Sequence, residues 1–481
     1  MKKNKLITKF KNWNPSIYAT ILLLTIPFFY FALKDFKLDN DFWFLINTGK
    51  YILNNGFTII EPFTIHSDFA FIPQQWLTCI IFYLIYTKLG MKGMLLLLLL
   101  LCIVIVYLIY KLSILISNKR SISIIITIFA YLMFLLYSIT TRPQIFDIII
   151  FISEIYIIEK YIKTNQNKYL YFLPLLSLLL INLHASMWLM FFVLLVPYYI
   201  EFIVNKKSIK SLLLLTLLSF AIGFINPYHI NAIKYLLTSY GINEINNAVN
   251  EMKAININNA LLIYIMIFIE LIFVYKNKGK NKISHILLFL GTTYLALKHY
   301  KGILYLIITM IPLLSNCFTK EKPLTNYTIS NKEKIIYICT LVLLVTFIGF
   351  NIKIDNTNSL VDVTNYLDKN SNKNIKLFTE YNEGGYLEYM GYKCYIDPRA
   401  EVFLKSNNKK EDIFKEYYDL RTGNLDIDDF ILKYNFDYLL VNKDENKFLF
   451  NYLSNNHDYE DVLNIEHFKC KIHLFKKNIN E

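Results

Sequence analysis

The amino-acid sequence predicts a polytopic α-helical membrane protein of about eleven spans with a C-terminal extracytoplasmic α/β domain. Apolar residues make up 55% of the 481 positions, and the mean hydropathy of +0.37 is high for a soluble chain. Uncharged apolar runs such as 93–110 and 212–225 supply most of the ~20 residues that a helix needs to cross a bilayer. A soluble domain of this size could not bury so many runs of that length.

The connecting loops set the expected orientation. Lysine and arginine gather in every second loop after residue 93, and cytoplasmic loops of membrane proteins carry an excess of these residues. We therefore expect the N-terminus in the cytoplasm and the C-terminal domain outside the plasma membrane. The expected apolar segments are 17–34, 75–88, 93–116, 121–140, 144–162, 169–183, 186–204, 211–226, 258–275, 284–297, 302–317 and 334–350.

Segment 75–88 would invert this orientation if it crossed the membrane. Its length of about 14 residues falls short of a span, so we expect a helix at the outer interface instead. Trp76, Tyr83 and Tyr86 suit that depth, because amphipathic aromatic side chains favour the interface.

The composition predicts two domains. Residues 1–351 form the membrane domain with a first outer loop at 35–74, whereas 352–481 carry more charge and shorter apolar runs. Cys394 and Cys470 lie in the second domain, where they form either a disulfide or two separate thiols. This domain is expected to contain helices at 360–368, 411–420 and 427–433 and strands at 376–380, 392–396 and 437–441.

The net charge of +13 does not indicate nucleic-acid binding, because the lysines lie mostly in short loops between apolar segments. The cysteines and histidines show no zinc-binding spacing. The lipid bilayer is thus the first expected partner.

Ionisable groups gather at the outer ends of the expected spans. Membrane segments tolerate such residues poorly, and those present usually serve function or pairing. Singly, each could cap a helix or anchor at the headgroups. As a set, they favour one site in which acids, cations and imidazoles activate a hydroxyl and hold a phosphate. The candidate substrate-binding residues are Arg142, Gln144, His184, Tyr228, Lys298, His299 and Lys301.

The first outer loop supplies the candidate catalytic acids, Asp39 and Asp41. Both follow the first span directly, and either could serve as a general base. If this stretch is helical, Trp43 and Phe44 can lie in the headgroup layer and hold the acids just above it.

Several short motifs continue this pattern along the chain. They are Asp39-Asn40-Asp41-Phe42-Trp43, Glu61-Pro62-Phe63-Thr64, Gln75-Trp76-Leu77, Arg142-Pro143-Gln144, Asn182-Leu183-His184, Asn226-Pro227-Tyr228, Asn382-Glu383-Gly384-Gly385-Tyr386 and Asp397-Pro398-Arg399. In these motifs, spread over residues 17–400, the chain resembles the bacterial C-type glycosyltransferase-like membrane proteins. Those proteins are similar to protein O-mannosyltransferases and lipid A aminoarabinose transferases.

The resemblance implies a multi-spanning fold, a catalytic acid on the first outer loop and a sugar donor carried on polyprenyl phosphate. Three positions depart from the family pattern. Leu45 replaces a histidine after the paired aromatics, Gln75 replaces a glutamate, and Glu61 replaces an aspartate. These departures leave open whether a divalent metal takes part and whether the protein is catalytic.

The motifs of the C-terminal domain allow two interpretations. Gly384 and Gly385 are typical of a tight turn before a strand, and Asp397 with Arg399 of a structural ion pair. Alternatively, this domain covers the membrane site and helps to bind the acceptor.

We therefore expect a membrane glycosyltransferase that moves a sugar from a polyprenyl-phosphate carrier to an extracytoplasmic glycan, lipid or protein acceptor. A transporter or flippase is less favoured, because the middles of the spans contain few ionisable residues. A non-catalytic cell-envelope assembly protein on the same scaffold is the third hypothesis.

Overall fold

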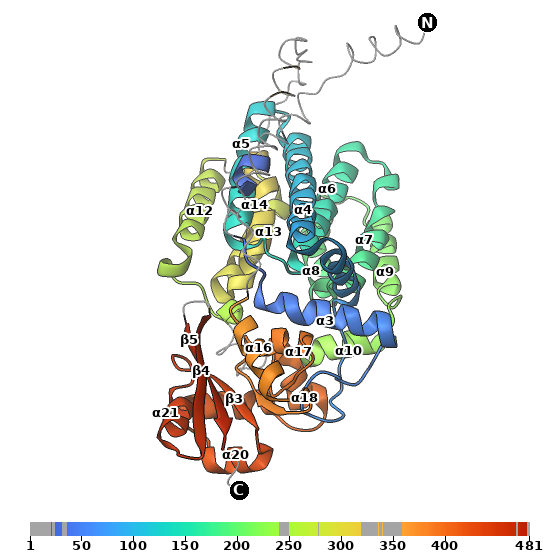
Figure 1. The fold of residues 1–481 in the computed structure, drawn as a ribbon. Coiled ribbons are helices and arrows are strands. Elements are labelled where there is room, and N and C mark those ends of the chain that lie inside the picture. Colours follow the sequence, from blue (N-terminus) through green and yellow to red (C-terminus); the bar gives the residue numbers. More distant parts are fainter. Residues whose placement is uncertain are drawn as a thin grey trace, which may run out of the picture.

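The computed structural model describes residues 21, 25–30, 36–239, 250–277, 279–318, 335, 339, 358–467 and 470–478. Within these ranges, a bundle of apolar helices stands on a smaller domain of short helices and a sheet (Figure 1). The expected span 334–350 and the predicted domain boundary at 351 lie outside the described residues, as does most of the segment 17–34.

The bundle confirms a helical membrane protein. Within the described residues, five helical stretches are long and apolar enough to cross a membrane: Trp76–Ser117, Arg120–Tyr137, Ala185–Val204, Ile257–Lys276 and Tyr300–Cys317. The total of about eleven crossings stays a prediction. The bundle helices are α4 (Trp76–Ser117), α5 (Arg120–Tyr137), α6 (Gln144–Thr164), α7 (Phe172–Leu183), α8 (Trp188–Val204), α9 (Lys210–Ile222), α12 (Ile257–Lys276), α13 (Ile283–Lys298) and α14 (Ile303–Cys317).

Helix α4 bends at Gly90, where φ is 60° and ψ is −151°. A straight helix of its 42 residues would be about 63 Å long, roughly twice the ~30 Å hydrocarbon thickness. The bend thus separates a first limb, residues 76–89, from a second limb inside the bundle. The separate helix predicted near 75–88 exists as this first limb, and its position at the outer interface stays a prediction.

Helix α3 (Asn40–Asn55) begins directly after Asp39, whose carboxylate accepts a hydrogen bond from the Asp41 backbone N–H at 3.0 Å. Trp43 and Phe44 are buried, at 8% and 7% exposure. The Trp43 ring packs against Tyr386 of the C-terminal domain, with centroids 4.8 Å apart. The C-terminal domain therefore covers Trp43, which is not the exposed headgroup anchor that the sequence predicted.

The C-terminal domain is the expected mixture of helices and strands. Its sheet has the order β2-β1-β3-β5-β4, with β1 parallel to both neighbours and the last three strands antiparallel. The strands are β1 (Lys376–Phe378), β2 (Lys393–Cys394), β3 (Tyr438–Asn442), β4 (Tyr459–His467) and β5 (Cys470–Lys477). The helices are α16 (Val361–Asn370), α17 (Gly384–Tyr389), α18 (Lys405–Asn408), α19 (Ile413–Thr422), α20 (Ile427–Tyr434) and α21 (Lys447–Asn455).

Every predicted helix and strand of this domain is present, although its ends shift by a few residues. The final hairpin β4–β5 and the helices α17, α18 and α21 were not predicted, nor was α10 (Ile230–Thr238) below the bundle. Cys394 and Cys470 are free thiols in strands that are separated by β1 and β3. The disulfide alternative is therefore wrong, and the separate thiols are confirmed.

Labelling from outside the cell is expected to reach a cysteine at Lys447 and to miss one at Lys280. Both positions are exposed, the first in α21 and the second between α12 and α13. The charge pattern of the loops predicts that they lie on opposite sides of the membrane. A membrane-impermeant maleimide on cells, with the six native cysteines replaced, measures this. Permeabilised cells should label both positions, and the reverse pattern in intact cells would contradict the orientation.

Candidate functional site

A cavity of about 730 Å³ lies between the C-terminal domain and the end of the bundle where α6 and α8 begin. This volume is in the range of small-molecule sites. Its wall includes five of the nine candidate catalytic and substrate-binding residues, although they come from segments far apart in the chain: Asp41, Arg142, Gln144, His184 and Lys301.

Arg142 organises the acids of this cavity. Its Nε donates to Asp39 Oδ1 at 2.8 Å, and its Nη1 lies 3.3 Å from Asp41 Oδ2. A third ion pair joins Nη1 to Glu251 of the short helix η3 (Asn250–Met252). Burial raises the pKa of the Asp41 carboxyl well above its usual value, and the nearby carboxylates of Asp39 and Glu251 raise it further, although the Arg142 guanidinium opposes them.

The acids do not fit a divalent cation. The Arg142 guanidinium already lies against both Asp39 and Asp41, in the place that a cation bridging the two carboxylates would take. Within the described ranges, no group of three or more Asp, Glu, His or Cys side chains is arranged to hold a metal ion.

A second polar group in the cavity pairs His184 with Asp147. His184 Nδ1 lies 2.6 Å from Asp147 Oδ2, and both side chains are buried. Because the carboxylate fixes one ring nitrogen, it sets the orientation of the imidazole at the cavity wall. Gln144 adds a buried side-chain oxygen that has no hydrogen-bond partner among the described residues, which is an acceptor available to a ligand.

The remaining expected residues do not line the cavity. Asp39 takes part only through Arg142. Tyr228 is buried against Phe57, with ring centroids 5.9 Å apart. Lys298 lies over the Tyr294 ring, and His299 Nδ1 lies 2.6 Å from the Met252 carbonyl oxygen. His299 thereby supports the segment that carries Glu251, and this geometry gives no support to direct substrate binding by Tyr228, Lys298 or His299.

The sequence did not predict the other polar residues of the wall as binding residues. Gln75 and Asn382 belong to motifs that were noticed, Tyr381 borders the Asn382 motif, and Glu401 follows the Arg399 motif, so these four had a nearby signal. The others lie in segments without a motif. The additional polar wall residues are Gln74, Gln75, Ser186, Ser239, Glu251, Lys253, Tyr381, Asn382, Glu401, Arg421, Asp444 and Glu445.

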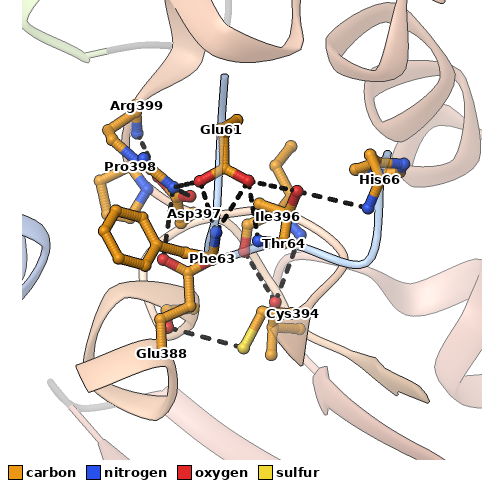
Figure 2. A network of polar contacts seen from close by, with 12 residues as sticks. Glu61, Phe63, Thr64, His66, Glu388, Cys394, Ile396, Asp397, Pro398 and Arg399 are labelled. Atoms are coloured by element: carbon orange, nitrogen blue, oxygen red, sulfur yellow. Dashed lines mark hydrogen bonds and ion pairs between the residues drawn. The ribbon is translucent and has the colours of Figure 1, made fainter. Parts of the chain in front are cut away.

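A buried ion-pair network, which we call the Arg399 network, joins the loop between α3 and α4 to the C-terminal domain (Figure 2). Arg399 Nη2 donates to Glu61 Oε1 at 2.9 Å and lies 3.4 Å from Glu388 Oε2. Its Nε donates to Asp397 Oδ1 at 2.9 Å. Glu61 also accepts hydrogen bonds from the backbone N–H and the hydroxyl of Thr64. The expected Asp397–Arg399 pair is therefore present as part of the larger Arg399 network.

The paired glycines allow α17 to pack closely against the backbone at Ile396 and at Phe44. A Cβ on Gly384 would lie 2.0 Å from the Ile396 carbonyl oxygen, and one on Gly385 would lie 3.4 Å from the Phe44 backbone nitrogen. These residues open a helix, so the expectation of a tight turn before a strand is wrong. Close contact between backbones explains the glycines instead.

The expectation that the spans contain few ionisable groups in their middles is also wrong. Glu154 in α6 and Glu270 in α12 are completely buried, and neither carboxyl has a hydrogen-bond partner among the described residues. At the opposite end of the bundle from the cavity, buried Glu159 pairs with Lys282 at 2.6 Å and lies 2.7 Å from His285 Nε2.

Two buried carboxyl groups behind the C-terminal wall make stability depend on pH. Burial raises the pKa of Glu380 to about 7, and burial next to Glu380 and Glu445 raises that of Glu383 to about 8. Because the folded state holds these protons more tightly than the unfolded state, the stabilisation is complete below about pH 4.5 and is lost as the pH rises through about 8.

We expect the unfolding temperature of the wild-type protein in detergent to fall from pH 5 to pH 8 more steeply than that of Glu383→Gln. Each pKa unit is equivalent to about 1.4 kcal/mol. Glu466→Gln, on the exposed side of β4, is the control and should keep the wild-type slope. Equal slopes for wild type and Glu383→Gln would contradict the assignment.

Comparison with known proteins supports the fold. No family model and no curated protein matches the chain. Among solved structures, it is similar to the archaeal oligosaccharyltransferase AglB from Archaeoglobus fulgidus, which was solved in complex with an inhibitory peptide and a dolichol-phosphate. The TM-score is 0.60 at 9% identity, over 90% of this chain and 69% of that chain. At this identity the likeness shows a fold shared with AglB and no more.

Proposed function

We propose that this protein transfers a sugar from a polyprenyl-phosphate carrier to an acceptor hydroxyl outside the cytoplasm, with inversion at the anomeric carbon. The observation that carries the proposal is the convergence of Asp41, Arg142, His184 and Lys301 on one cavity. The fold shared with AglB, which was solved with a dolichol-phosphate, adds support.

Asp41 is the better candidate for the general base. Its carboxylate lines the cavity, whereas Asp39 caps α3 and pairs with Arg142. Burial raises the pKa of Asp41 well above its usual value, and a base works best when its pKa lies nearer the ambient pH. Asp39 and Arg142 are then positioning residues for Asp41.

The reaction is a single displacement. The acceptor oxygen attacks the anomeric carbon while its proton passes to the Asp41 carboxylate. The bond between the anomeric carbon and the phosphate oxygen breaks, and its electron pair leaves with the polyprenyl phosphate. Lys301 and Lys253, which also line the cavity, would stabilise the charge on the departing phosphate. Arg142 is less suited to this role than the sequence indicated, because three carboxylates already surround its guanidinium.

A flippase for the same lipid-linked sugar is the second candidate. The buried carboxyl groups of Glu154 and Glu270 favour it, because transporters place ionisable residues inside the membrane along the path of protons or substrates.

The test uses the full chain in proteoliposomes with undecaprenyl phosphate that carries a radiolabelled hexose or pentose. We expect label in an acceptor fraction and free undecaprenyl phosphate in equal amounts. Movement of intact donor between the leaflets without cleavage would replace the transferase by the flippase. Neither cleavage nor movement of any donor would leave the non-catalytic assembly role.

A further inference from the structure

The two walls of the cavity differ in charge. The bundle side presents Arg142, Lys253 and Lys301 against Asp41 and Glu251, whereas the C-terminal domain presents Arg421 against Glu401, Asp444 and Glu445. We call the second surface the acidic wall. The two sides therefore suit different parts of a reaction that brings an anionic donor and a separate acceptor together.

Two carboxyl groups of the acidic wall, those of Asp444 and Glu401, form no ion pair within the described residues. Arg421 Nη2 lies 3.0 Å from Glu445 Oε2, so these two charges compensate each other. Asp444 is exposed, and its carboxylate accepts a long hydrogen bond of 3.4 Å from the Lys471 backbone N–H. Glu401 is half-buried in the same wall. The Arg399 guanidinium acts on its carboxyl, but three other carboxyl groups pair with that guanidinium. A ligand that reaches this wall meets a net negative surface.

The acidic wall also offers groups that bind hydroxyls. Asn382 lines the cavity, and its side-chain amide makes no hydrogen bond to any residue that the structure describes. An amide supplies two donors and an acceptor, which match the hydroxyl groups of a glycan.

The same wall lacks the features that usually bind peptides. None of its cavity-lining residues belongs to a described strand, so it offers no sheet edge for an added strand. Most of its side chains are polar, and an amphipathic helix would need an apolar groove instead.

From these features we propose that the acceptor of this protein is a glycan that carries free amino groups and that Asp444 and Glu401 select it. This inference rests on the proposed function and deepens it. The phosphate of the donor would stay with Lys253 and Lys301, while the ammonium groups of the acceptor would lie against the acidic wall. The negative charge of the acidic wall would keep an anionic glycan away from this wall, since like charges across a contact are unfavourable.

The test measures binding of three matched tetrasaccharides to the full-length protein in detergent at 0.15 M salt. They are tetramers of glucosamine, N-acetylglucosamine and galacturonic acid, which are cationic, neutral and anionic. We expect the cationic tetramer to bind at least about tenfold more tightly than the neutral one and the anionic one to bind weakest. Because the whole chain carries +13, a general electrostatic attraction would give the opposite order.

Asp444 is exposed, so its substitution does not threaten folding. Asp444→Asn should weaken the preference for the cationic tetramer about threefold, and Asp444→Lys should abolish it. Asp429→Asn, exposed in α20 away from the cavity, should leave it unchanged.

Four results would overturn the inference. They are equal binding of the cationic and anionic tetramers, no binding of the cationic one, an unchanged preference in Asp444→Lys, and tighter binding of a Lys-Ser-Lys peptide than of any tetramer. Donor cleavage is measured separately. Failure of cleavage with the cationic preference intact would remove the proposed transferase and leave the subsite standing.

Discussion

Replacing Asp41 with asparagine is expected to reduce sugar transfer by a factor of about 10²–10⁴, the usual contribution of a general base. Asparagine keeps the shape of the side chain but cannot take the proton of the acceptor hydroxyl. The measurement is the rate of polyprenyl-phosphate release at saturating donor, together with donor affinity. We expect the rate to fall while donor binding stays near wild type, because the base acts on the acceptor.

Asp39→Asn is the matched control. An asparagine can still cap α3, so this variant loses the ion pair with Arg142 but keeps the helix start. Its rate should fall less than that of Asp41→Asn. A larger loss in Asp39→Asn would exchange the roles of the two acids, and full activity of the double variant would end the transferase proposal.

The pH dependence of the rate adds a second readout for Asp41. Burial raises the pKa of this carboxyl well above its usual value, and only the ionised form can accept a proton. The rate should therefore rise with pH on the acidic side of its optimum. The residual activity of Asp41→Asn should lack this rise. The same acidic limb in both proteins would assign it to another group.

Much of the bundle could be predicted because each span is a local property of the chain. An apolar run of sufficient length forms a helix wherever it lies, and the charge of the loops indicates which helix ends share a side. This is why Arg142 and His184 could be expected at one site, although neither the depth of the cavity nor the pairing of Asp147 with His184 had a sequence signal.

The contribution of the C-terminal domain to the site could not be predicted, because it depends on how two distant parts of the chain pack. Trp43 looked like a headgroup anchor, since an aromatic residue beside a span is usually one. It is buried instead by Tyr386 and Tyr389, which lie far along the chain. Glu251 had no motif around it, and only the fold brings it to Arg142.

The role of the motif Glu61-Pro62-Phe63-Thr64 also depends on packing between distant parts of the chain, which the sequence could not predict. Its resemblance to a family motif marked it as important but did not say why. In the structure Glu61 is completely enclosed and binds Arg399, which is 338 positions later in the chain. The motif therefore holds two domains together, and with them the cavity that they share.

Substitution of Arg399 by methionine is accordingly expected to destabilise the packing of the C-terminal domain on the bundle by about 3–5 kcal/mol, the usual cost of removing one partner from a buried ion pair. The Arg399 side chain is 1% exposed and lies among Glu61, Asp397 and Glu388. Burial and the neighbouring Asp397 raise the pKa of Glu388 well above its usual value. The loss of Arg399 therefore leaves these buried carboxyl groups without their cation.

Hydrogen exchange of the full-length protein in detergent measures this effect locally. Because 1.4 kcal/mol corresponds to a factor of ten, protection in peptides covering 61–72 and 384–399 should fall by about 10²–10⁴-fold in Arg399→Met. Lys433→Met is the matched control, since Lys433 also pairs with two carboxylates but is 41% exposed, and such surface pairs contribute ~0–1 kcal/mol. Adding Glu61→Gln to Arg399→Met removes one unpaired charge and should restore part of the protection. Equal losses in Arg399→Met and Lys433→Met, or no gain from Glu61→Gln, would contradict this prediction. The C-terminal domain would then be held on the bundle by packing around the Arg399 network and not by the ion pairs within it.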